Sequence, residues 1–168
     1  EVVAYSHSND ISKESLRKSS ENLKDTLKSK KGTYNHEIPK TNSKYYENIN
    51  PIESKTFDSK IDLLNSVNNY LRSKGSIVNQ VTANFLGEHK SIEIIRSDNQ
   101  VLKDDRPLVR FNVSVVLEKD GKKETGVYGV GGRQSYDDYL KDGSWKDVCD
   151  EAFRIANVNL ESKPAPAG

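Results

Sequence analysis

The chain has 168 residues, which suits one domain or one domain with an appendage. Its 26 lysines and arginines nearly cancel its 25 acidic residues, and no basic stripe stands out, so we expect no nucleic-acid partner. No apolar run approaches the roughly 20 residues of a membrane-spanning helix, so we expect no membrane partner, and the single cysteine excludes an internal disulfide framework, which fits a cytoplasmic protein.

The first 32 residues predict a strand followed by a polar helix. The letters VVAYS, residues 2–6, favour a short strand. Asp10 or Ser12 can cap a helix that runs to about Lys31, because their side-chain oxygens accept hydrogen bonds from the free amides of the first turn. The apolar stripe of this helix is thin, which is typical of a surface helix. We expect residues 1–32 to form a strand–helix segment in front of the rest of the chain.

A long connection follows this helix. Residues 33–55 show no usable period and are rich in Asn, Lys and Ser. Loops of this length are uncommon inside a compact domain, so the segment is interpreted as a linker or a functional loop. Tyr45 and Tyr46 are candidates to anchor it on a neighbouring surface.

A second helix is predicted from about Phe57 to Ser73. Thr56 can cap its start, and Gly75 can end it. Apolar residues recur at steps of three and four, which predicts one buried face. The residues expected on that face are Phe57, Ile61, Leu64, Val67 and Leu71.

The pattern then changes to period two, which is typical of strands. One strand is expected over residues 77–87, with Gly87 ending it, and a short one over 92–94, before a turn at 97–100. Residues 109–117 alternate apolar and polar side chains, which predicts a half-buried strand.

The Asp120-Gly121 pair predicts a tight hairpin after that strand. Both positions of a type I′ turn need positive φ, which Asp and Gly tolerate. If Lys119 faces Lys122, the apolar residues of the two strands fall on one face of the sheet. A slip of one residue would break this match, so we expect that register.

A glycine-rich loop with one helical turn leads to the last predicted helix. Ser144 is expected to cap it, with Asp147 completing a capping box. Together the elements predict an α+β two-layer sandwich: about four antiparallel strands, two helices on one face, and the N-terminal strand–helix segment in front. The α+β domain is assigned to residues 56–163, and the prolines after it indicate that the last helix ends before Pro164.

The histidines and the cysteine do not predict a reactive site. His7, His36 and His89 lack the spacing of a metal site and are interpreted as exposed or hydrogen-bonded. Cys149 lies in the apolar stripe of the last helix, which indicates a small core residue rather than a nucleophile.

Three carboxylates lie close together in the sequence. Asp137, Asp138 and Asp142 follow Arg133 and flank Lys141. Paired carboxylates can transfer protons, but these fall in a predicted turn, and simple solvation is the favoured interpretation.

The stretch GVYGVGGR, residues 126–133, matches neither a dinucleotide fingerprint nor a P-loop. Its glycines can let another backbone approach the end of a strand, and that backbone can be the protein's own or a bound peptide's. Arg110 points away from the apolar face, toward solvent or toward whatever covers the other side of the sheet. The candidate residues for a peptide channel or an interface are therefore Gly129, Gly131, Gly132, Arg133 and Arg110.

Three segments carry a resemblance to the TldD/PmbA family, once described as modulators of DNA gyrase. Residues 106–136, RPLVRFNVSVVLEKDGKKETGVYGVGGRQSY, resemble the central region of TldD proteins. Residues 151–168, EAFRIANVNLESKPAPAG, are similar to the family's helix and the Pro-Ala-Pro-Ala-Gly joint after it. Residues 2–12 and the helix after them resemble the family's earlier strand–helix segment. The resemblance implies that residues 1–32 complete an N-terminal subdomain whose first strands are absent. It also implies that residues 164–168 are a joint to a missing catalytic domain. The Arg-Pro-Leu-Val-Arg and Gly-Gly-Arg elements favour the TldD branch over its PmbA (TldE) partner.

The resemblance implies a cytoplasmic zinc metallopeptidase that cleaves unfolded peptides and pairs with a TldE/PmbA-like homologue or with itself. The family holds zinc with a His-Glu-x-x-x-His helix downstream of the joint, in which the glutamate activates water. The pair His36-Glu37 is not followed by the second histidine. No metal or catalytic residue carries over, so we expect no cofactor in this chain and zinc in the full-length family.

Two hypotheses of different classes follow. In the first, the chain is the non-catalytic scaffold and substrate-channel part from the N-terminal half of a TldD-type zinc metallopeptidase, ends before the metal-binding motif and is inactive by itself. In the second, it is a free-standing peptide- or protein-binding module that adds a strand to its sheet edge. The low hydrophobic content of 33% and the glycine-rich strand end motivate the second.

Overall fold

The computed structural model describes residues 3–27, 46–96, 99–141, 143–166 and 168. The chain divides into two compact units, Glu1–Ser43 and Lys44–Gly168. No helix in the described ranges is long and apolar enough to cross a membrane.

The first unit contains one described helix, α1 (Lys13–Leu27). Both predicted capping residues accept hydrogen bonds from backbone N–H groups at the start of this helix. Ser12 Oγ accepts from the backbone N–H of Ser15 at 3.2 Å, and Asp10 Oδ1 accepts from the N–H of Ser12 at 2.8 Å. The predicted continuation to Lys31, and most of the predicted linker with Tyr45, lie outside the described residues.

The predicted strand at the start of the first unit is not found. Residues 3–6 form no strand, and the side chains of Val3 and Tyr5 are exposed. A strand needs a partner for its backbone groups, and the described residues of this unit supply none.

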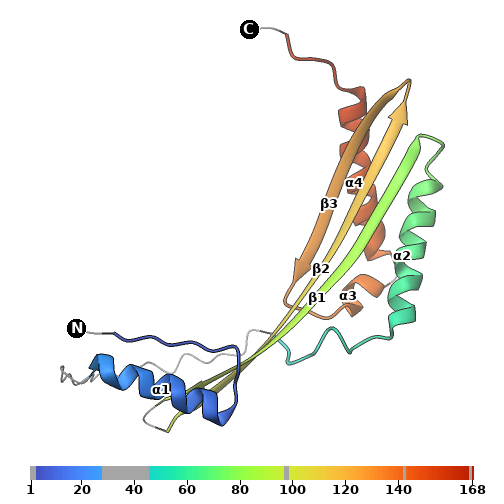
Figure 1. Ribbon diagram of the computed structural model, residues 1–168. Helices are drawn as coiled ribbons and strands as arrows, with labels where there is room; N and C mark the ends of the chain where they lie inside the picture. Colours follow the sequence, from blue (N-terminus) through green and yellow to red (C-terminus); the bar gives the residue numbers. More distant parts are fainter. Residues whose placement is uncertain (1–2, 28–45, 97–98, 142, 167) are drawn as a thin grey trace. The chain divides into compact units, whose positions relative to one another are not determined.

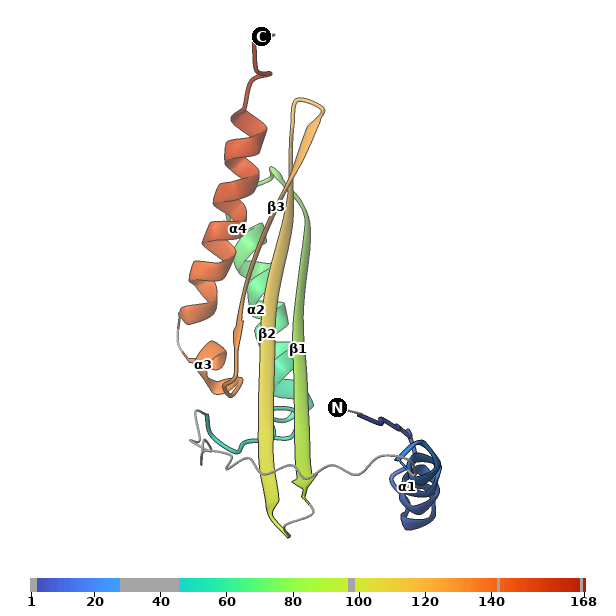
Figure 2. The same cartoon turned by 90° about the vertical axis from the view of Figure 1, so that its left-hand side faces the viewer.

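The second unit is a three-stranded antiparallel sheet with helices on one face (Figure 1). The strands are β1 (Val78–Ile95), β2 (Val101–Lys119) and β3 (Lys122–Gly132), in that order across the sheet. Two long helices, α2 (Phe57–Arg72) and α4 (Ser144–Glu161), cover the face, and the views in Figures 1 and 2 agree on this. The predicted α+β sandwich is confirmed, with three strands in place of about four.

The strand count differs because Gly87 does not end a strand. The segments predicted as two strands form a single β1, in which Gly87 pairs with Val109 of β2. A Cβ at Gly87 would collide with the hydroxyl of Tyr136. The glycine therefore makes room for a packed aromatic ring inside a continuous strand.

The hairpin between β2 and β3 forms as predicted. Asp120 and Gly121 have φ of 52° and 79°, as a type I′ turn requires. Lys119 pairs with Lys122, so the apolar residues of both strands fall on the helix side of the sheet.

The core lies between the sheet and the two helices. Alternate residues of β2 are buried against α2 and α4: Val109, Phe111, Val113, Val115 and Leu117. The buried residues of α2 are Leu63, Val67 and Leu71. Thr56 caps α2 as predicted, and Gly75 follows its end with φ of 137°.

Two residues expected on the buried face of α2 lie at the surface. The side chains of Phe57 and Ile61 are 75% and 39% exposed. The predicted face was too wide, because the stripe that meets the sheet runs along Leu63, Val67 and Leu71.

The helix α4 begins differently from the prediction. Its N-cap is Gly143, with φ of 91°. Ser144 is instead the first helical residue, and its Oγ donates to the carbonyl of Asp138 at 2.9 Å. That bond ties the start of α4 to the short helix α3 (Asp137–Leu140).

The other end of α4 is held by the hairpin. Lys122 Nζ donates to the carbonyls of Asn159 at 2.8 Å and of Leu160 at 3.0 Å. A cation at a helix C-terminus satisfies carbonyls that have no partner within the helix. The turn between β2 and β3 and the end of α4 are therefore joined.

Candidate functional site

The glycine-rich end of β3 lies beside Arg110 of β2. In the ladder, Gly129 pairs with Asn112, Gly131 with Arg110 and Gly132 with Val109. Arg110, Gly129, Gly131 and Gly132 line one shallow hollow. The structure thus brings together four of the five candidate residues, at a place where β3 presents bare backbone.

A row of polar side chains crosses the sheet next to this hollow, on the face away from the helices. Arg110 Nε donates to Asn112 Oδ1 at 2.9 Å, and Asn112 Nδ2 donates to Asn84 Oδ1 at 3.1 Å. Arg110 is exposed, and no carboxylate pairs with its guanidinium among the interactions of the described residues. Its remaining N–H groups can therefore donate hydrogen bonds to an acidic group or to a backbone carbonyl.

Two of these glycines also have a role in the packing of the sheet. A Cβ at Gly129 would collide with Asn112 Oδ1, and a Cβ at Gly131 would lie 2.6 Å from the carbonyl oxygen of Val109. Close packing of β3 on β2 thus accounts for both glycines, and contact with a ligand is a further role that the geometry permits.

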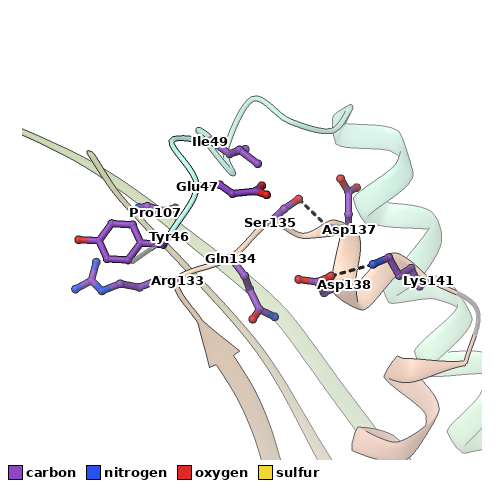
Figure 3. Close-up of a pocket in the computed structure, with 10 residues that line it drawn as sticks. All are labelled: Tyr46, Glu47, Ile49, Pro107, Arg133, Gln134, Ser135, Asp137, Asp138 and Lys141. Atoms are coloured by element: carbon purple, nitrogen blue, oxygen red, sulfur yellow. Dashed lines mark hydrogen bonds and ion pairs between the residues drawn. The ribbon is translucent and has the colours of Figure 1, made fainter. Parts of the chain in front are cut away.

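Arg133 lies apart from the other four candidates. It follows the end of β3 and lines a second hollow, shown in Figure 3. Its guanidinium carbon lies 5.3 Å from the centre of the Tyr46 ring, within the range of a cation–π contact. The Tyr46 hydroxyl lies 3.4 Å from both carboxylate oxygens of Asp104, to which it donates.

These contacts fix the segment that precedes α2. Tyr46 joins β2 and the chain after β3, as the sequence suggested for an anchoring tyrosine. Sequence reasoning missed Asp104, which also pairs with Arg106 at 2.6 Å. The signal for it was a run of charged residues at the entry of a strand, where a structural and a functional role cannot be separated by sequence alone.

The carboxylates near Arg133 form ion pairs. Asp137 lies 2.7 Å from Lys55 Nζ, and the hydrogen bond from that lysine lowers the pKa of Asp137. Asp138 pairs with Lys141 at 3.1 Å (Figure 3). The two carboxylates have separate cationic partners, which favours a structural role over proton transfer, and Asp142 lies outside the described residues.

The described residues do not fit a zinc site. They contain no group of three or more His, Cys, Asp or Glu side chains that could hold a metal ion. His7 stacks on Tyr5 with ring centres 6.0 Å apart. The prediction of an exposed or hydrogen-bonded histidine is wrong for His89, whose Nε2 is buried and has no hydrogen-bond partner among the described residues. His36 lies outside the described part of the chain.

Cys149 is a core residue, as predicted. It is fully buried in α4, and burial raises the pKa of its thiol to about 12. A thiol in this environment stays protonated at neutral pH and is not a nucleophile.

A polar cluster between α2 and α4 gave no signal in the sequence. The Tyr70 hydroxyl donates to Asp150 at 2.9 Å, and Lys74 Nζ lies 2.5 Å from the same carboxylate. The rings of Tyr70 and Trp145 pack edge to face, with their centres 5.5 Å apart. These contacts hold the two helices together, and they depend on a tertiary arrangement that no local pattern encodes.

Comparison with known proteins decides the family. A family model described as the PmbA/TldA metallopeptidase central domain matches residues 50–160. This chain belongs to the PmbA/TldD metallopeptidase family.

Named relatives agree with this assignment to the PmbA/TldD family. The chain is 34% identical over its whole length to a metalloprotease TldD homolog from Buchnera aphidicola subsp. Acyrthosiphon pisum. It is 39% identical, over 73% of its length, to a metalloprotease TldD homolog from Haemophilus influenzae. It spans 36% of the length of the Buchnera protein and 26% of the Haemophilus protein in these alignments.

Proposed function

We propose that this chain is a non-catalytic central part of a TldD-type zinc metallopeptidase. In this role it supports the catalytic part and forms one wall of a channel for unfolded peptides, in a cytoplasmic assembly with a TldE/PmbA-like partner. One observation carries the proposal: the chain matches the central domain of the family while its described residues contain no set of metal ligands.

The residues on the open face of the sheet favour the proposed role as a channel wall. Near its glycine-rich end it presents bare backbone at Gly129 and Gly131, and a guanidinium at Arg110 with free donors. Such a surface can contact the backbone of an unfolded peptide without demanding particular side chains, because backbone carbonyls are common to every peptide.

The test compares this chain with a full-length relative. Both are incubated with zinc, freed of excess metal, and assayed for bound zinc and for hydrolysis of an unfolded casein. We expect the chain to hold no stoichiometric zinc and to cleave nothing, while the full-length protein does both. Zinc-dependent hydrolysis by the chain alone would overturn the proposal.

Strand addition by a free-standing module is the second candidate function. It is favoured by the bare backbone at the end of β3, which lies at an edge of the sheet. The same chain is titrated with unfolded casein peptides and followed by amide chemical shifts. Saturable shifts confined to β3 would favour this candidate over a scaffold that is inert by itself.

A further inference from the structure

The outer edge of β3 presents backbone groups at alternate residues. This strand lies at one side of the sheet and pairs with β2 alone (Figure 1). The two residues that flank a two-residue turn form a hydrogen-bonded pair, and such pairs alternate along an antiparallel ladder. Counting from Lys119 and Lys122, every second residue of β3 therefore directs its N–H and C=O groups away from β2. These residues are Lys123, Thr125, Val127, Gly129 and Gly131.

The free part of this edge is the stretch 127–131. The Thr125 carbonyl accepts a hydrogen bond from Asn159 Nδ2 of α4 at 3.5 Å, which agrees with its outward direction. Val127, Gly129 and Gly131 are exposed, and no other described element bonds to their outward groups. An extended peptide can therefore pair with about five residues of β3.

The Arg110 guanidinium lies over this stretch, on the open face of the sheet. A Cβ on Gly129 would collide with Asn112 Oδ1, so the end of the Asn112 side chain lies over the backbone of β3. Arg110 Nε donates to the same oxygen at 2.9 Å, and a Cβ on Gly131 would lie 3.4 Å from the Cβ of Arg110. Because neither glycine has a side chain, the guanidinium can reach across β3 to a strand about 4.8 Å beyond it.

The guanidinium has donors to spare. Its two terminal nitrogens have no hydrogen-bond partner among the described residues. Arg110 is also the one charged residue among the described residues that line this hollow, so no carboxylate of the lining competes for it. A planar guanidinium with two free nitrogens binds a carboxylate through two parallel hydrogen bonds.

We propose that the outer edge of β3 pairs with an extended peptide, and that Arg110 selects peptides with a carboxylate opposite Gly129 or Gly131. The inference rests on the proposed binding of peptide by this surface and names the chemistry that the surface prefers. Paired residues of neighbouring strands share a face of the sheet, so the peptide side chains at these positions lie on the same face as Arg110. The carboxylate belongs to an acidic side chain or to the C-terminus of the peptide.

The glycines of β3 make this preference effective. The strand contains four glycines, and glycine in a strand weakens its pairing because it supplies no side chain to pack. A peptide without a carboxylate therefore gains little beyond backbone hydrogen bonds. The pair with Arg110 accordingly makes a larger relative difference here than on a strand with packed side chains.

The first test compares peptides on the intact chain. Three labelled peptides of about ten residues are titrated by fluorescence anisotropy. Two are blocked at both ends and have Asp or Asn at one central position, and the third has Asn there and a free C-terminus. We expect a carboxylate at either place to lower the dissociation constant about threefold to tenfold relative to the blocked Asn peptide.

The two ways in which this test can fail are distinguishable. Equal binding of all three peptides would overturn the preference for a carboxylate and leave strand addition standing. No binding of any peptide would overturn strand addition and the preference with it. If only one of the two carboxylate peptides binds more tightly, that result identifies the source of the carboxylate and supports the proposal.

The second test assigns the preference to one side chain. Arg110→Gln should remove the difference between the carboxylate and Asn peptides and change binding of the Asn peptide by less than about twofold. Arg154→Gln is the control, since Arg154 pairs with Glu151 on the surface of α4, and it should keep the difference. A difference that persists in Arg110→Gln would overturn the proposal.

The third test locates the peptide and compares the chain with a full-length protein that contains it. Amide chemical shifts of Val127, Gly129 and Gly131 should move on titration, and N-methylation of alternate peptide residues should abolish binding, because it removes the donors that pair with β3. The preference that depends on Arg110 should persist in the full-length protein. Its loss there would show that the rest of the protein covers this edge, and would overturn the proposal.

Discussion

Gly126 of β3 lies directly against Ala152 of α4, so closely that a Cβ on the glycine would collide with the alanine carbonyl oxygen. The same Cβ would lie 2.9 Å from the Cβ of Ala156. The helix therefore rests on bare backbone, and its small residues face the strand at this point.

We predict that Gly126→Ala lowers the free energy of unfolding by about 2 kcal/mol, because α4 must move away from the sheet to accept the methyl group. Gly132→Ala is the control, since its Cβ would meet only the flexible Gln134 side chain, at 3.1 Å. Urea denaturation followed by circular dichroism measures both. Equal stability of the two variants would contradict this account of the contact.

The buried thiol of Cys149 predicts a dependence of stability on alkaline pH. The pKa of the thiol is about 12 in the folded chain, above its ordinary value of 9.0. Between these values the unfolded chain loses the proton and the folded chain keeps it, so stability should fall by up to about 1.4 kcal/mol per pH unit. The difference in unfolding free energy between the parent and Cys149→Ala, measured from pH 8 to pH 11 in urea, isolates this effect from other groups. A constant difference would contradict the prediction.

The Asp150 carboxylate predicts a loss of stability in acid. Burial raises its pKa, but hydrogen bonds from Lys74 and Tyr70 outweigh burial, and the pKa is lower than its ordinary value of 3.8. The stabilising effect is present above pH 3.8 and is lost as pH falls through the folded pKa. Because the side chain is about half exposed, the effect should be only about 0.5 kcal/mol. Asp150→Asn should show a smaller loss of unfolding free energy between pH 6 and pH 3 than the parent chain.

Replacing Arg110 should weaken the binding of peptide substrates. In a full-length protein that contains this chain, Arg110→Gln should raise KM for unfolded peptides by roughly threefold to tenfold and leave kcat nearly unchanged, because the residue binds but does not react. Arg154→Gln is the control, since Arg154 pairs with Glu151 on the surface of α4. A fall in kcat without a change in KM would argue against a role for Arg110 in binding peptide.

A large side chain at Gly131 would affect stability as well as function, because this glycine packs closely on β2. The substitution Gly131→Val would set a Cβ 2.6 Å from the carbonyl oxygen of Val109. We therefore expect it to lower the melting temperature as well as activity. Gly132→Ala in the full-length protein separates the two effects, because the sheet can accept it.

Sequence patterns predicted the structure correctly where the residues that determine a feature are neighbours in the sequence. The Asp120-Gly121 turn needs positive φ at both positions, and its register then fixes which residues of β2 and β3 face the helices. The same register sets Arg110 beside Gly131, so four of the five residues of the predicted candidate site lie close together in the structure.

Sequence patterns predicted the structure wrongly where a residue far away in the sequence determines the local arrangement. Gly87 looks like the end of a strand until Tyr136 packs over it. Phe57 has the spacing of a buried residue, but the described sheet does not reach it. Arg133 follows the other candidates in sequence, yet the chain turns after β3 and places it over Tyr46.

The bonds from Lys122 to the end of α4 also have a mechanical meaning. Ser162 adds a third carbonyl to the same ammonium, at 3.3 Å. A force applied to the chain after α4 would reach the β2–β3 turn through this side chain before the helix could unwind. We therefore expect tension on residues 163–168 to be transmitted through Lys122 to the β2–β3 hairpin, so that the sheet as well as the helix resists it.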